Sequence, residues 1–193
     1  MFLVAGLGNP GSEYEKTRHN VGFMVADQLA AMYRTKIKLV QSQALIAKIE
    51  RVASPSFILA KPFTYMNLSG NSVFQLLKKF NFSPQQLIVI HDDLDLDTGN
   101  VQIKKGGSIA GHRGLRSIVE RLGTMDFIRI RIGIGRPAEK DDIVEYVLTP
   151  FRSSERALIE EAIALSVNIV LDCLDYGFDY TAIKYPRKKN STQ

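Results

Sequence analysis

The chain has 193 residues, 45% hydrophobic and 23% charged, a composition typical of a globular protein with one substantial core. No apolar run approaches the ~20 residues needed to cross a bilayer, and the first residues lack the basic region and cleavage site of a signal peptide. Cys173 is the only cysteine, which excludes an internal disulfide and a cysteine-based metal site. We therefore expect a cytoplasmic protein.

The charge balance is mildly basic, with 25 Lys and Arg against 20 Asp and Glu, a net charge of +5 and a pI near 9.3. This balance makes a nucleic-acid partner more plausible without requiring one. Basic residues cluster at Lys104-Lys105, Arg113 with Arg116, Arg129 with Arg131, and from Lys184 to Lys189. Each cluster alone is equally compatible with a solvated face.

Strand and helix patterns alternate along the chain. We expect strands at 2–5, 37–51, 56–60, 87–90, 100–104 and 127–134, and helices at 21–33, 71–80, 113–122, 140–147 and 153–175. Asn20 is the expected cap of the first helix, and Leu158, Ile159, Ala162, Leu165 and Ile169 are the expected inner face of the last. The alternation predicts an α/β fold, a sheet covered by helices on both faces. We expect the chain to form one domain over residues 1–185, followed by a basic tail over residues 186–193 that frays.

Four polar loops each follow a predicted strand, at residues 6–20, 61–70, 91–98 and 105–113. Ligands of α/β sheets bind at loops beyond the carboxyl ends of the strands. The economical hypothesis is a single site built from all four loops.

The first loop contains Gly6-x-Gly8-x-x-Gly11, which formally matches the dinucleotide-binding pattern. Two features oppose that interpretation. Residues 12–18 show no helical periodicity, so no helix N-terminus would meet a pyrophosphate. Pro10 also removes an amide donor where phosphate-binding amides are needed. We expect no nicotinamide or flavin site, which sets aside an oxidoreductase.

Three histidines are candidates for acid–base chemistry. An isolated loop histidine such as His19 is more often an exposed surface residue without a role. However, Asp92 leaves a buried strand and needs a hydrogen-bonding partner, which His19 could be. A carboxylate on one imidazole nitrogen would leave the other nitrogen free to accept a proton. His91 continues the strand and is expected to be packed, whereas His112 lies at a helix start, where it could cap the helix or touch a ligand.

The remaining polar signals have competing interpretations. The carboxylates of Asp92, Asp93, Asp95 and Asp97 resemble a divalent-metal loop, but the glycine and glutamate of a calcium site are out of register. Asn67 is either a helix cap or, like Asn9 on the opposite wall, an amide that can donate to an oxyanion and accept from a substrate. No nucleophile-elbow pattern is present, which favours direct attack by water.

Six segments, in order, resemble the bacterial peptidyl-tRNA hydrolase family. They are Gly6–Gly11 with Tyr14, Thr17–Asn20, Lys61–Gly70, His91–Leu96, Gly111–Ile118 and Arg129–Gly135. The resemblance covers nearly the whole chain and implies an enzyme that cleaves the ester between a peptide and the 3′-terminal ribose of tRNA. It implies a single α/β domain with a central mixed, mostly parallel sheet, a monomer, and no cofactor or metal.

The same resemblance implies roles for individual residues. His19 would be the catalytic base, Asp92 would orient and stabilise it, and Asn9 would help to distinguish peptidyl-tRNA from free aminoacyl-tRNA. Residues that would line the substrate site are Tyr14, Tyr65 and Asn67, with Met66 beside them. Apart from the resemblance, the basic residues Lys104, Lys105 and Arg131 and the basic tail are candidate contacts for tRNA phosphates.

Arg113 departs from the family pattern, which commonly has asparagine at this position. Arginine donates hydrogen bonds but cannot accept them, so it could exchange water positioning for contact with a tRNA phosphate or a carboxylate.

The alternative function is that of a non-catalytic RNA-binding relative, such as the plant organelle splicing factors that resemble this family.

Overall fold

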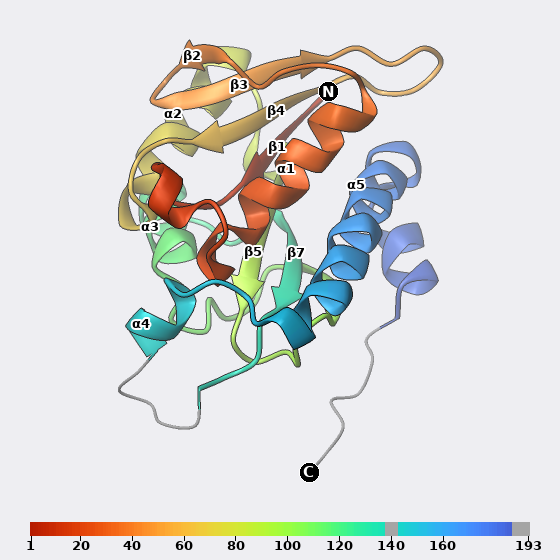
Figure 1. The fold of residues 1–193 in the computed structure, drawn as a ribbon. Coiled ribbons are helices and arrows are strands. Elements are labelled where there is room, and N and C mark those ends of the chain that lie inside the picture. The colour runs from red at the N-terminus through yellow and green to blue at the C-terminus, as the bar shows by residue number, and fades with distance from the viewer. Residues whose placement is uncertain (138–142, 187–193) are drawn as a thin grey trace.

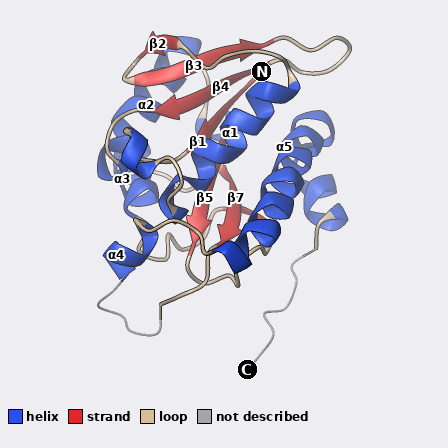
Figure 2. Cartoon of the chain, viewed as in Figure 1, coloured by secondary structure: helices blue, strands red, loops and turns tan. Residues whose placement is uncertain are grey.

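A sheet of seven strands separates two layers of helices in the computed structural model, which describes residues 1–137 and 143–186 (Figures 1 and 2). The strands are β1 Phe2–Gly6, β2 Leu39–Gln41, β3 Ala44–Ile49, β4 Phe57–Pro62, β5 Leu87–Asp93, β6 Val101–Lys105 and β7 Ile128–Gly133. The helices are α1 Val21–Met32, α2 Ser69–Phe80, α3 Arg113–Leu122, α4 Ile143–Val147 and α5 Arg156–Lys184.

The strand order is β2-β3-β4-β1-β5-β7-β6. The four central strands run parallel, whereas β2, β3 and β6 pair antiparallel to their neighbours. All seven residues of β5 are buried, as expected for a central strand covered on both faces. The predicted mixed sheet, parallel at its centre, is confirmed.

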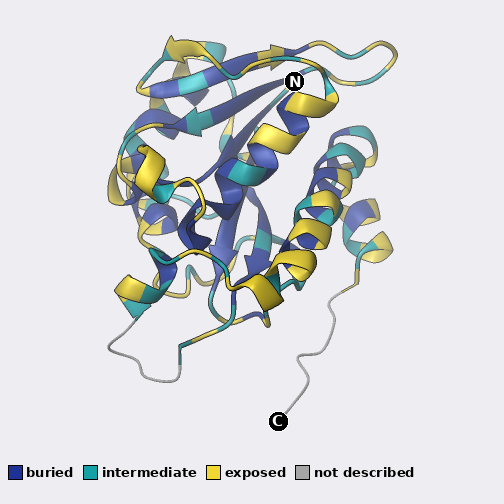
Figure 3. Cartoon of the chain, in the orientation of Figure 1, coloured by how far each residue is buried: buried dark blue, intermediate teal, exposed yellow. Residues whose placement is uncertain are grey.

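Side chains that alternate along the central strands form two separate cores. Val4, Ile88 and Ile90 pack with α1 and α5 on one face, and Leu3 and Val89 pack with α2 and α3 on the other. Figure 3 shows that the central strands are buried between these helices, whose outer faces are exposed. The three-layer prediction is therefore correct, and the two cores hold the carboxyl edge of the sheet in place.

The predicted long strand over 37–51 is wrong, because two strands lie there. β2 and β3 form a hairpin whose turn residues Ser42 and Gln43 have φ of 53° and 56°. A two-residue hairpin turn of type I′ needs positive φ at both central residues and usually uses Asn-Gly. Ser-Gln carries no such signal, which is why the sequence pattern did not indicate the turn.

The last helix runs nine residues beyond its predicted end at 175 and contains a kink at Gly177, where φ is 81°. Leu158 was expected to face inward but is 49% exposed, whereas Ile159 and Ala162 are buried as predicted. Residues 140–142 of the predicted fourth helix, and all of the predicted tail except Pro186, lie outside the described residues.

No helix in the described ranges is long and apolar enough to cross a membrane.

Candidate active site

A cleft of about 410 Å³ opens at the carboxyl edge of the central strands. All four loops that the sequence singled out contribute to it, as the single-site hypothesis expects. Their lining residues include Asn9 and His19 from the first, Tyr65 from the second, Asp92 from the third and His112 from the fourth.

The fourth loop reaches the cleft for a reason that the sequence argument missed. Because β6 is antiparallel to β7, Lys105 ends at the opposite edge of the sheet. The chain then returns alongside β7, where the buried Arg129 donates to the carbonyls of Gly106 and Ser108. Burial lowers the pKa of Arg129 to about 10. This buried guanidinium therefore anchors the loop that carries His112 to the cleft.

His19 and Asp92 are in direct contact. The Nδ1 atom of His19 lies 2.8 Å and 2.9 Å from the two carboxylate oxygens of Asp92, and both side chains are buried. Asp92 belongs to β5, which is longer than predicted and includes the whole His91-Asp92-Asp93 sequence. Since Nδ1 faces a carboxylate, it carries the hydrogen. The Nε2 atom of His19 has no hydrogen-bond partner among the described residues and remains available at the cleft.

His112 is a second imidazole on the same carboxylate. Its Nδ1 accepts the backbone N–H groups of Gly114 and Leu115 at 3.1 and 3.2 Å, capping α3, so its hydrogen is on Nε2. That Nε2 donates to an Asp92 oxygen at 3.0 Å. Burial alone would raise the pKa of Asp92, but the imidazoles of His19 and His112 hold it well below its usual range. Asp92 is therefore a firmly ionised acceptor for two imidazoles.

These three side chains do not fit a metal ion well. Their ligand atoms lie within 4.8 Å of one another, a spacing that a metal site could use. However, the helix cap places the hydrogen of His112 on Nε2, so this nitrogen offers no lone pair to a cation. We retain the prediction that the site needs no metal.

The acidic run that resembled a metal loop is also divided among different partners. Asp93 accepts from Arg131 at 2.7 Å, and Asp95 pairs with Arg136. Burial opposes ionisation of Asp93, but the hydrogen bond from Arg131 lowers its pKa. Because the carboxylates pair with separate cations, they do not converge on one ion.

His91 is packed inside the sheet, as predicted. Its Nδ1 donates to the Asp92 carbonyl at 2.7 Å, and its buried Nε2 has no partner among the described residues. The ring lies edge-on to His112 with the centroids 5.0 Å apart. Burial, assisted by His112, lowers the pKa of His91 to about 3. His91 is therefore neutral, and its hydrogen bond holds the backbone carbonyl of Asp92.

Asn9 is held by two residues that leave one of its atoms free. Its backbone N–H donates to Asn20 Oδ1 at 2.8 Å, and Asn20 Nδ2 donates back to its carbonyl at 2.9 Å. Asn20 was expected to cap α1 but braces Asn9 instead. Asn9 Oδ1 accepts from the Met66 amide at 2.8 Å, whereas its Nδ2 has no hydrogen-bond partner among the described residues. An amide oxygen can accept a second hydrogen bond, so the expectation that Asn9 both donates to and accepts from a substrate stays a prediction.

The glycines of the first loop serve packing. A Cβ on Gly6 would lie 2.2 Å from the Gly22 carbonyl, and one on Gly8 would lie 2.7 Å from the Phe23 ring. Both contacts bring the loop against α1, as close backbone approach requires. Gly11 instead has a φ of 116°, which favours glycine, so the three glycines are explained without a dinucleotide.

The predicted substrate residues lie at different places around the cleft. Tyr14, Tyr65, Asn67 and Arg113 line it, and Met66 lines it from a buried position. The side chains of Asn67 and Arg113 are exposed, with no hydrogen-bond or ionic partner among the described residues. Asn67 belongs to a short 3₁₀-helix, Met66–Leu68, whose cap is Tyr65, so the capping interpretation of Asn67 is wrong.

Two predicted phosphate contacts do not line the cleft. Arg131 is nearly buried and donates to Asp93 at 2.7 Å and to Gln102 at 3.2 Å. Lys104 is half-buried on β6. Neither residue is among those that line the cleft.

An apolar wall of the cleft was missed by the sequence analysis. It is formed by Leu94, Ile109, Ile143, Val144, Val147 and Leu148, with Arg136 beside it. Four of these residues come from α4 and the residue after it. A five-residue helix has too few turns to show which face is apolar, so no local pattern could have identified this wall.

The fold and the cleft define an α/β protein in which a buried His–Asp pair opens into a partly apolar cleft. The sequence profile of the family described as peptidyl-tRNA hydrolase matches residues 3–193. The chain is 45% identical over 188 residues to the peptidyl-tRNA hydrolase of Aquifex aeolicus, covering 97% of each protein. It is 50% identical over 155 residues to that of Mycobacterium sp. strain KMS, covering 80% of this chain and 81% of the other.

Solved structures agree. The crystal structure of peptidyl-tRNA hydrolase from Acinetobacter baumannii superimposes with a TM-score of 0.88 at 36% identity, covering 96% of this chain and 93% of that one. The chain therefore belongs to the peptidyl-tRNA hydrolase family and is an enzyme of this type.

Proposed function

We propose that this protein hydrolyses the ester that joins a peptide, or an N-blocked amino acid, to the 3′ ribose of tRNA. The observation that carries the proposal is the hydrogen bond between His19 Nδ1 and Asp92, because it leaves His19 Nε2 at the cleft without a partner among the described residues. Such a nitrogen is suited to accept a proton from water.

In the proposed reaction, His19 removes a proton from water as the water oxygen attacks the ester carbonyl. Asp92 stabilises the imidazolium that forms. The carbonyl oxygen becomes an oxyanion, for which the amide groups of Asn9 and Asn67 are candidate donors. When the ester bond breaks, the imidazolium returns the proton to the departing ribose oxygen.

The two halves of the cleft suit the two parts of this substrate. The apolar wall on α4 fits the peptide side chains, and Tyr14, Tyr65 and Met66 fit the region of the scissile ester. Arg113 is exposed at the cleft and is our main candidate for a tRNA phosphate contact. Lys104 and Arg131 stay proposed contacts, although Arg131 would first have to leave Asp93. We further propose that the protein acts as a monomer in the cytoplasm, where tRNA is used.

Hydrolysis of an N-acetyl-aminoacyl-tRNA by the wild type and by His19→Ala, with and without EDTA, tests this function. We expect wild-type activity that EDTA leaves unchanged, and a loss of roughly 10³-fold or more in the variant. Equal rates for the two proteins would refute His19 as the base. A wild type that binds the tRNA without hydrolysing it would favour the RNA-binding alternative.

A further inference from the structure

Arg18, the residue before the proposed base, is almost entirely buried, with 2% of its surface exposed. Its Nη1 donates to Thr149 Oγ1 at 2.7 Å and to the Pro150 carbonyl at 2.9 Å. Its Nη2 donates to Glu155 at 2.7 Å. Its backbone N–H also donates to the Thr149 carbonyl at 3.0 Å. A single side chain therefore ties the loop of His19 to the segment between α4 and α5.

Aromatic rings cover the guanidinium. The guanidinium carbon lies 4.2 Å from the centroid of the Tyr146 ring and 5.4 Å from that of Phe151. Stacking on rings and forked donation are properties of arginine that lysine does not reproduce. The contact set is therefore specific for an arginine and does not merely need a positive charge.

Two residues that contact Arg18 flank two residues that line the cleft. Tyr146 and Thr149 contact Arg18, whereas Val147 and Leu148, between them, line the apolar wall. Figure 1 shows α4 at the edge of the molecule, away from the sheet. Its position relative to the base thus depends on the contacts made by this segment.

We propose that Arg18 is a positioning residue that sets the distance between the α4 wall and His19, and thereby the enzyme's preference for substrates with large apolar acyl groups. Arg18 is buried and acts through Tyr146 and Thr149. The inference rests on the proposed function, because the acyl group is the part of the substrate assigned to this wall. Loosening the wall weakens contacts with a large acyl side chain and barely affects a substrate that has none.

The test compares one tRNA charged with N-acetylphenylalanine or with N-acetylglycine. For Arg18→Lys, we expect kcat/KM to fall about 10-fold more for the phenylalanyl than for the glycyl substrate, since an ångström-scale displacement is costly in a positioned site. Thr149→Val removes the hydrogen bond from Arg18 Nη1 to Thr149 Oγ1 and the one from Thr149 Oγ1 to the Tyr146 carbonyl, but it leaves the other contacts of Arg18, so it should change the ratio in the same direction by a smaller factor. If the Arg18→Lys protein does not fold, the substrate ratio of Thr149→Val tests the inference instead.

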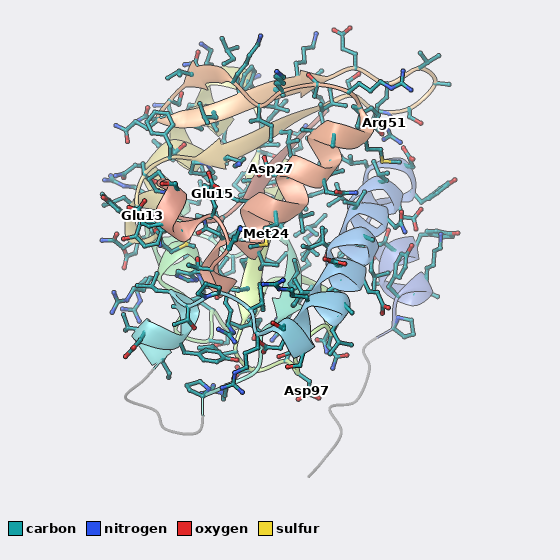
Figure 4. All side chains as sticks on the ribbon, in the orientation of Figure 1. Glu13, Glu15, Met24, Asp27, Arg51 and Asp97 are labelled. Atoms are coloured by element: carbon teal, nitrogen blue, oxygen red, sulfur yellow. The ribbon has the colours of Figure 1, made fainter. Side chains whose placement is uncertain are left out.

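Arg51→Lys is the matched control. Arg51 is also a nearly buried arginine, paired with Asp175 at 2.7 Å. Figure 4 shows it at the end of the molecule opposite α4. This variant should lose stability without changing the substrate ratio. Equal losses on both substrates in Arg18→Lys and Thr149→Val would overturn the inference, since Arg18 would then support only His19. A wild type that hydrolyses neither substrate would instead refute the proposed function.

Discussion

Both carboxylate oxygens of Asp92 lie within 3 Å of the His19 Nδ1 atom, at 2.8 and 2.9 Å, although 73 residues separate them in the chain. The same carboxylate accepts the Nε2 hydrogen of His112. Asp92 is thus the point at which the first, third and fourth loops are joined, and its substitution affects all of them.

Asp92→Asn should abolish most activity while leaving the fold intact. The amide of the new asparagine would donate to His19 Nδ1, which moves the imidazole hydrogen to Nε2 and removes the base. We expect kcat to fall roughly 10³-fold or more, as in other imidazole–carboxylate sites. Single-turnover hydrolysis measures the loss. Asp175→Asn, which removes a carboxylate far from the cleft, is the control and should keep kcat. Near-normal kcat in Asp92→Asn would contradict the assigned tautomer.

Asn9→Asp tests the free amide of Asn9. The new side chain still accepts from the Met66 amide, so the loop stays anchored, but it has no donor for an oxyanion. We expect kcat to drop by about 10²-fold, the usual cost of losing one oxyanion donor. Thermal unfolding shows whether the variant is folded. An Asn9→Asp protein that is folded and fully active would exclude this role.

His91 makes folding stability depend on pH. Its pKa is about 3 in the folded protein against an ordinary value of 6.5, so the unfolded chain binds more protons between these values. Its contribution is therefore complete above pH 6.5 and is lost as the pH falls toward 3. At pH 5 the wild type should have lost about 2 kcal/mol relative to pH 7 from this group alone.

His91→Asn keeps a donor for the Asp92 carbonyl and cannot titrate. Urea unfolding at pH 7 and pH 5 should show a smaller loss of stability for this variant than for the wild type. The depressed pKa values of Asp92 and Asp93 affect stability mainly near and below their ordinary value of 3.8. The other two histidines are present in both proteins, so the difference between the two pH profiles reports His91. Parallel pH profiles for the two proteins would rule out the neutral buried imidazole.

Arg113→Asn tests the proposed phosphate contact. Removing one cation from a phosphate should weaken tRNA binding and reduce the slope of log Kd against log salt by about one. Arg116→Asn, on the same helix but outside the cleft lining, is the control and should change the slope less. Filter binding over a salt series measures both. An unchanged slope for Arg113→Asn would remove Arg113 from the tRNA interface.

The sequence by itself determined the elements and the loops that carry the chemistry. The helix over 113–122 was predicted to the residue, and α1 and β7 to within one, because hydrophobic periodicity and caps are local properties. His19 and Asp92 were paired correctly, since a carboxylate leaving a buried strand requires a partner.

Only the tertiary structure decided how these parts are used. Asn20 could cap a helix or brace Asn9, and the choice depends on where β1 and α1 meet. The α4 wall and its attachment to Arg18 join segments about 130 residues apart. A local sequence pattern cannot predict such contacts, because these side chains come together only when the whole chain folds.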